Sequence, residues 1–282
     1  MNRLTLLLLP LLMSLVALTG CPVTNPDPHP ICTMPGGGAA ENASERQVVI
    51  LQIKLTSIEV PVGTASESEE IWNYLDEERA QAGHAATLGR NGMRVGLAKG
   101  STWKDLARIL QKMTGQTLAE QNFAALPGQP FQVELKTFLD PQTIFTSYAD
   151  RTLSGADYPS GDNLLVLSVT LDETNTSRMI VTAMPQIRST HRVQDIVTDN
   201  TGRLTFVDHP VLYSFRPATF QTSMSDDEIL VIGPGAESRR PTSIGYHFLL
   251  HEKQQLQFET VLVVSIRAVK ASVKTPAVSV ER

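Results

Sequence analysis

The pattern of hydrophobic and polar positions predicts a region of mixed strands and helices followed by a longer region of strands alone. The first ordered segment is expected at 49–56, where Val49, Leu51, Ile53 and Leu55 alternate with polar residues. Such alternation is typical of a strand with one buried face. A proline and a glycine, at 61 and 63, are expected to end this strand.

A helix is predicted after this strand. Ser66 and Glu69 have the spacing of a capping box, in which the serine oxygen and the glutamate carboxylate satisfy free backbone N–H groups at a helix start. We therefore expect a helix from about 66 to 82. The side chains expected on its inward face are Ile71, Trp72 and Leu75.

A second strand and a second helix are expected next. Asn91-Gly92 predicts a turn, and a short apolar strand follows over 93–97. Thr102 and Asp105 form another capping box, and apolar residues then recur at helical spacing up to Gly115. The order strand, helix, strand, helix predicts a small α/β module over 47–126.

Beyond Pro127-Gly128 only strand patterns occur, at 131–139, at 165–171, at 179–183 and in a long final strand. They predict a β-rich antiparallel sheet or sandwich over 127–271, without helices, and a flexible tail over 272–282. The expected class is thus α+β. The final strand should place Leu256, Phe258, Leu262, Val264 and Ile266 on one face and Gln257, Glu259, Ser265 and Arg267 on the other.

The beginning of the chain has the pattern of an export signal. Arg3 gives a basic start, and residues 4–18 are almost wholly apolar. This run of about fifteen residues contains Pro10, and it is shorter than the roughly twenty residues that a spanning helix needs. The alternatives are an ordinary cleaved signal and a short uncleaved anchor.

Leu18-Thr19-Gly20-Cys21 resembles the lipobox of bacterial lipoproteins. In that family the cysteine thiol takes a diacylglycerol, and cleavage leaves the cysteine as the first residue. The resemblance implies that 1–20 is a signal peptide and that Cys21 carries fatty acyl chains such as palmitate, which hold a protein to a membrane. Pro22 stands where inner-membrane retention would place Asp, so we expect a lipid anchor in the outer membrane, facing the periplasm.

The segment 21–46 is predicted to be a flexible tether that follows the lipidated cysteine. It holds five prolines and the run Gly36-Gly37-Gly38, a composition that cannot form a packed core. Cys32 is the second of only two cysteines. If Cys21 is lipidated, a disulfide framework is excluded. Cys32 then either stays an unpaired thiol near the membrane or pairs between chains.

The overall charge argues against nucleic acid as a partner. The formal net charge is −5, and it becomes −6 when Arg3 leaves with the signal peptide. Binding to phosphates needs clustered lysine and arginine, which the sequence does not show.

Histidine and carboxylate patterns give no convincing metal site. His247 and His251 are four apart, with Glu252 adjacent, and on a helix this spacing can bind zinc. The glutamate that usually follows the first histidine is missing, however, and we interpret the segment as a strand. His191 and His209 have no companion residues at ligand spacing. The acidic run at 226–228 (Asp-Asp-Glu) lacks the alternating ligands of a calcium loop, so we expect a solvated hairpin tip there.

No sequence motif assigns catalytic residues or a cofactor. There is no Gly-x-Ser-x-Gly elbow, no Gly-x-Gly-x-x-Gly and no phosphate-binding Gly-Lys-Ser/Thr loop. We therefore predict no catalytic, cofactor-binding or metal-binding residues, and lipidation of Cys21 is the only site assigned.

Residues 220–270 resemble the C-terminal part of the secretin family. Glu228–Gly233 resembles a strand and glycine of a late hairpin, 241–245 with Phe248 is similar to the landmarks that follow, and 262–266 resembles the closing apolar strand. The family's Asp and second Pro are missing here. Secretins are multimeric outer-membrane channels of secretion systems, in which α/β modules precede a β-rich region.

The sequence as a whole predicts a membrane-anchored lipoprotein of the cell envelope that acts by binding or assembly rather than by catalysis. Its expected partners are the membrane, through lipid on Cys21, and proteins of the envelope or of a secretion system. Two alternatives remain open: a secretin-like subunit or accessory lipoprotein of a secretion system, and a hydrolase of envelope polymers.

Overall fold

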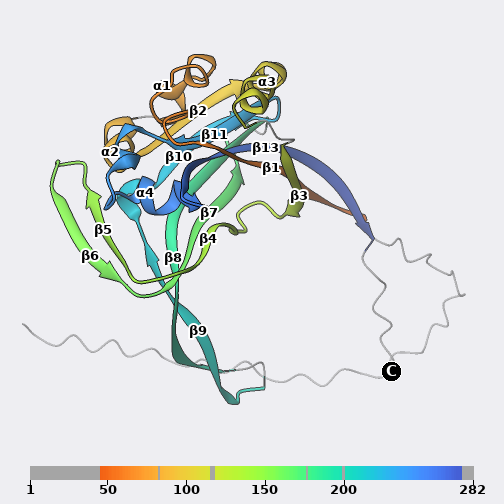
Figure 1. Cartoon of the computed structure of the whole chain (residues 1–282). Helices are drawn as coiled ribbons and strands as arrows, with labels where there is room; N and C mark the ends of the chain where they lie inside the picture. Colours follow the sequence, from red (N-terminus) through yellow and green to blue (C-terminus); the bar gives the residue numbers. More distant parts are fainter. Residues whose placement is uncertain (1–44, 82, 115–117, 176, 199–200, 275–282) are drawn as a thin grey trace, which may run out of the picture. The chain divides into compact units, whose positions relative to one another are not determined.

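Antiparallel β-sheet dominates the fold, with a few short helices, which confirms the predicted α+β class. The computed structural model describes residues 45–81, 83–114, 118–175, 177–198 and 201–274, all in one compact unit (Figure 1). The expected signal peptide, most of the tether, Cys21 and Cys32, and the tail from 275 lie outside the described residues.

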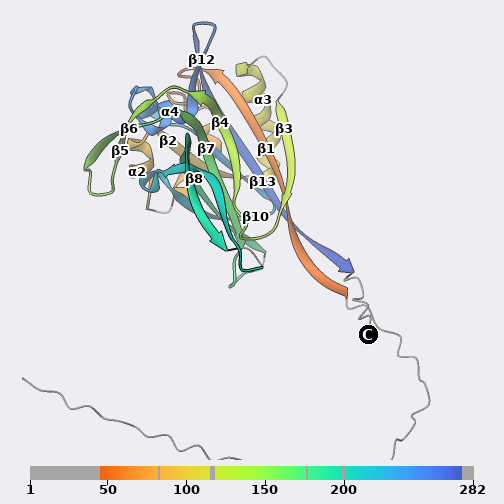
Figure 2. The ribbon, with the colours of Figure 1, turned by 90° about the horizontal axis from the view of Figure 1, so that it is seen from below.

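The first and last strands of the described chain lie side by side in the first sheet, sheet A. They pair antiparallel from Glu45 opposite Lys274 to Pro61 opposite Phe258, as Figure 2 shows. The strand order is β2-β11-β13-β1-β3, with β12 paired to β13. The bounds are β1 Glu45–Pro61, β2 Met93–Lys99, β3 Ala119–Ala125, β11 Glu228–Pro234, β12 Leu250–Lys253 and β13 Leu256–Lys274.

The second sheet, sheet B, has the order β10-β8-β7-β4, and β9 pairs with β8. A separate hairpin, β5–β6, lies between β4 and β7 in the chain. The bounds are β4 Phe131–Leu139, β5 Gln142–Ser147, β6 Leu153–Tyr158, β7 Gly161–Leu171, β8 Arg178–Thr198, β9 Leu204–Ser214 and β10 Phe220–Ser225.

Sheets A and B form a sandwich because one apolar cluster joins their facing sides. Strand β1 contributes Leu51, Ile53 and Leu55 to this cluster, and they pack with side chains of β7 and β8. The opposite face of sheet A carries a second cluster, in which Val261 and Val263 pack with Leu106 of helix α3. Strand β13 is therefore buried on both faces at its centre, as its run of valines allows.

The predicted division at 126/127 does not separate two sheets. Strands β1, β2 and β3 come from the expected α/β module, yet they share sheet A with β11 and β13 from the expected β-rich domain. The reason is that the order of elements along a chain does not reveal which strands pair across long distances. Strands β1 and β13 also extend slightly beyond the expected limits 47 and 271.

The helix expected over 66–82 is wrong. The segment contains only the 3₁₀ turn η1 (Trp72–Tyr74) and the short helix α1 (Glu77–Gln81), because Asp76 between them forms a β-bridge to Leu97. Ser66 caps no helix: its hydroxyl donates to the carboxylate of Glu259. Burial of the expected inward residues Ile71 and Trp72 is nevertheless confirmed.

Glu259, expected on the polar face of the last strand, is fully buried. Its carboxylate accepts hydrogen bonds from the backbone N–H groups of Gly63 at 2.8 Å, Ala65 at 2.9 Å and Ser66 at 3.0 Å. The loop after β1 is thereby held onto β13. Burial of this carboxylate is tolerated because backbone donors surround it.

The expected absence of helices beyond 126 is also wrong, since a helix follows Ser243. The hydroxyl of Ser243 accepts a hydrogen bond from the N–H of Tyr246 at 3.1 Å, as an N-cap does. Six residues are too few for a periodic signal. The remaining bounds are α2 Ala85–Arg90, η2 Gly100–Thr102, α3 Trp103–Thr114, η3 Arg216–Ala218, η4 Ala236–Arg239 and α4 Ile244–Leu249.

Strands β8 and β9 continue beyond sheet B as a two-stranded ribbon (Figure 1). The pairing of β8 with β7 ends at Ser189 opposite Gly161, whereas the pairing with β9 runs on to Thr198 opposite Leu204. We call residues 191–198 and 204–210 the β8–β9 arm.

Candidate functional site

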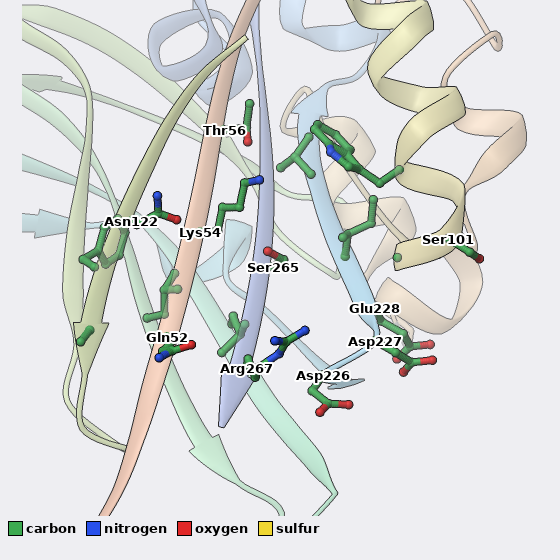
Figure 3. A pocket seen from close by; sticks show the side chains of 18 residues that line it. Gln52, Lys54, Thr56, Ser101, Asn122, Asp226, Asp227, Glu228, Ser265 and Arg267 are labelled. Atoms are coloured by element: carbon green, nitrogen blue, oxygen red, sulfur yellow. The ribbon is translucent and has the colours of Figure 1, made fainter. Parts of the chain in front are cut away.

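A groove of about 840 Å³ lies on the face of sheet A that α3 covers only in part (Figure 3). Lys54 on β1 lies between Asn122 on β3 and Ser265 on β13, because these residues are opposite each other in the sheet register. Gln52 is paired in the same way with Arg267. This regular row of polar side chains forms the floor of the groove.

The acidic segment at 226–228 forms the opposite side of the groove, near Ser101 in the turn η2 that precedes α3 (Figure 3). Asp226 and Asp227 are exposed in the turn between β10 and β11, which confirms the predicted hairpin tip. Glu228 departs from that prediction, because it is only 8% exposed and forms an ion pair with Arg79. The pKa of Glu228 is lowered, since hydrogen bonds from Ser225 and Arg79 outweigh the effect of burial.

The groove offers hydrogen bonds and charge but no catalytic arrangement among the described residues. Lys54 is already paired with Glu120, at 2.7 Å between Nζ and Oε1. The described hydroxyls of Thr56, Ser101 and Ser265 form no hydrogen bond to a histidine or carboxylate that could act as a base.

The two histidines considered for zinc contact different groups. His247 lies on α4, with Nε2 3.1 Å from the carbonyl oxygen of Thr143, and burial together with the charge of Lys136 lowers its pKa to about 4. His251 lies on β12, with Nε2 3.1 Å from a carboxylate oxygen of Glu59. The described residues contain no group of three or more His, Cys, Asp or Glu that could hold a metal ion.

His251 also belongs to a chain of contacts that resembles the order of a hydrolytic triad. Its Nδ1 lies 3.4 Å from the hydroxyl of Thr260, while its Nε2 faces Glu59. Thr260 is only 6% exposed and does not line the adjoining cavity. The Thr260 hydroxyl is therefore largely shielded from solvent.

The β8–β9 arm carries the remaining candidate residues. His209 lies on it with Nε2 3.4 Å from the carboxylate of Asp195, and both side chains are exposed. His191 starts the arm and is exposed as well. These positions agree with ordinary surface histidines.

The arm also exposes large apolar side chains that sequence reasoning missed. Ile196 and Phe206 are opposite each other and are 61% and 67% exposed, and Leu204 on the same face is 71% exposed. Val197 and Val207 lie on the other face, also exposed. The signal was present in the sequence, because apolar residues flank the turn-forming residues Asn200-Thr201-Gly202 on both sides.

None of the helices in the described ranges has the length and apolar character that a membrane span requires. Comparisons with protein-family models, with curated proteins and with solved structures found no match. Of the segments that resemble secretins, Glu228–Gly233 falls in β11 and 262–266 in β13, and these two strands pair antiparallel. Phe248 is buried in α4.

Proposed function

We propose that the protein is a lipid-anchored component of the cell envelope that acts by assembly with other protein chains. The exposed apolar β8–β9 arm is the observation that carries this proposal, and the lipobox ending at Cys21 supports the anchor. In this proposal the groove and the arm serve binding, and no catalytic step is involved.

The arm has the properties of an element that is covered in the assembled state. An isolated two-stranded hairpin is at best marginally stable in water, and clustered exposed apolar side chains mark interaction sites. Within the described strands both outer edges of the arm are open, that of β8 beyond Thr190, whose N–H still donates to the carbonyl oxygen of Ser160, and that of β9 throughout Leu204–Ser214. Open strand edges readily pair with another chain.

The lipid anchor is tested by replacing its cysteine. Cys21→Ser is expected to abolish incorporation of a fatty-acid analogue and to release the protein from membranes, because the acyl chains supply the anchoring energy. Cys32→Ser, which changes the only other cysteine, should keep full labelling. Labelling that persists in Cys21→Ser would end the lipoprotein proposal.

Assembly through the arm is tested by placing charges on one of its faces. The double variant Ile196→Asp, Phe206→Asp should weaken association at least about tenfold, because burying each apolar side chain contributes about 1.5–3 kcal/mol. Multi-angle light scattering of the full chain in mild detergent measures this. Leu256→Asp, at a 62% exposed leucine outside the arm, is the matched control and should associate like the original protein. Unchanged association of the double variant would contradict the role of the arm.

A secretin-like subunit is the second candidate function. If the arms of neighbouring copies stand side by side in the same orientation, the free edge of β9 in one copy meets the free edge of β8 in the next. These two strands would then pair antiparallel, as β8 and β9 do within one copy. Such head-to-tail contacts close into a ring when the rotation between copies allows closure. A multimer of fixed size that resists detergent supports this candidate, and a monomer in light scattering contradicts it.

A further inference from the structure

A cavity of about 420 Å³ lies between β4, α4 and β12, away from the groove and the arm. Part of its wall is apolar. Its polar side chains are the pair formed by Glu59 and Lys253, together with Lys136, Thr137, His251, Glu252 and Gln257. Cavities of this size with a few convergent polar groups are typical of small-molecule sites. The apolar lining residues are Leu135, Leu139, Leu250 and, through its ring, Tyr246.

Lys136 is the unusual group in this cavity. Its ammonium donates a hydrogen bond to the carbonyl oxygen of Tyr246 at 3.0 Å and lies 6.0 Å from the centre of that residue's ring. It forms no ion pair with a carboxylate among the described residues. Burial lowers the pKa of Lys136 to about 8. An ammonium has three donors, so this cation retains hydrogen-bonding capacity that a single carbonyl does not use.

The neighbouring charges do not neutralise Lys136. The carboxylate of Glu59 is engaged by Lys253, with Nζ 2.7 Å and 2.5 Å from its two oxygens, and by His251. Burial lowers the pKa of His251, although Glu59 opposes this shift. His247 on α4 is also held neutral, and Glu252 on β12 has an exposed side chain. The lining thus holds two lysines and two glutamates, and Lys136 is the lysine that no described carboxylate contacts within ion-pairing distance.

We propose that this cavity binds a small organic monocarboxylate, whose carboxylate pairs with the Lys136 ammonium and whose alkyl or aryl part lies against the leucines. An ammonium without an ion pair among the described residues can pair with one negative charge, and a charge-assisted hydrogen bond would satisfy its free donors. The apolar walls select a ligand with a hydrocarbon part over an inorganic anion. Lys136 is the residue that determines this specificity.

Hexanoate is a suitable probe for the full chain in detergent, measured by isothermal titration calorimetry. We expect saturable binding of hexanoate and none of hexanol, which has the same chain without the charge. Lys136→Met should weaken hexanoate binding at least about tenfold, whereas Lys136→Arg should retain part of it, because it keeps the charge. Lys104→Met, at an exposed lysine on α3, is the control and should bind like the original protein.

The pH dependence provides a readout that a purely structural role would not change. Only the protonated ammonium of Lys136 can pair with the hexanoate carboxylate, and this form is depleted as the pH rises above the pKa of Lys136. Hexanoate binding should therefore be about tenfold or more weaker at about pH 9.5 than at about pH 7. Hexanoate should also raise the pKa of Lys136 itself, which NMR of the ¹³C-dimethylated lysine reports. The proposal is overturned if hexanoate does not saturate the protein, or if it binds equally well to Lys136→Met.

Discussion

Replacing Glu259 with alanine is expected to lower the free energy of unfolding by about 3 kcal/mol or more, because the change leaves several backbone donors without their acceptor. The carboxylate is fully buried and accepts hydrogen bonds from three backbone N–H groups between Gly63 and Ser66. Without it these donors stay buried and unpaired, at a cost of about 1–3 kcal/mol for each such group.

Denaturant unfolding of the variant measures this loss. Glu252→Ala is the matched control, because Glu252 is an exposed glutamate on the neighbouring strand β12, and its loss should change stability by no more than about 0.5 kcal/mol. Glu259→Gln should also destabilise, since its amide turns two N–H donors toward a site built from donors. A stability of Glu259→Ala close to that of the control would show that the loop after β1 is not fixed by this carboxylate.

The second large effect is expected at the centre of β13. Leu262 is fully buried between sheets A and B, and Leu262→Ala should cost about 2–5 kcal/mol. Val261 is equally buried on the opposite face, under α3, so Val261→Ala should destabilise too, although this change removes fewer carbon atoms than Leu262→Ala does. Gln257→Ala, at an exposed position of the same strand, should do little.

Melting temperature and denaturant unfolding distinguish the possible outcomes. Negligible effects at both Leu262 and Gln257 would mean that β13 is not a core strand. A large effect at Leu262 with none at Val261 would instead contradict the packing of α3 on the outer face of sheet A.

Hydrophobic periodicity within a short segment correctly predicts several strands and one helix. The alternation at 131–139 and at 165–171 and the helical spacing after Trp103 all correspond to observed elements. Strand β3 escapes prediction because AEQNFAA contains one large apolar residue and lies at the edge of sheet A. The pairing of β1 and β11 with β13 joins segments far apart in the chain, and no local pattern carries that information.

The candidate sites were missed for the same reason, because local patterns do not show which distant segments pack against a residue. Lys136 alternates with apolar residues in β4, so the sequence predicts a solvated position, and only the packing of α4 and β12 against β4 encloses it. Alternation assigns Glu259 to a polar face for the same reason, and the loop that buries it comes from the other end of the chain. The β8–β9 arm, in contrast, could be predicted from the sequence, because apolar residues occur on both sides of the turn-forming residues 200–202.

The position of β13 in the strand order decides when the protein can fold. This strand is the last of the described chain to be synthesised, yet it lies in the middle of sheet A, between β11 and β1. A chain that ends before residue 256 would leave both neighbours with long unpaired apolar edges, of the kind that lead to aggregation. Folding of the sandwich therefore has to wait until β13 has been synthesised, and the high contact order of the β1–β13 pairing makes it slow.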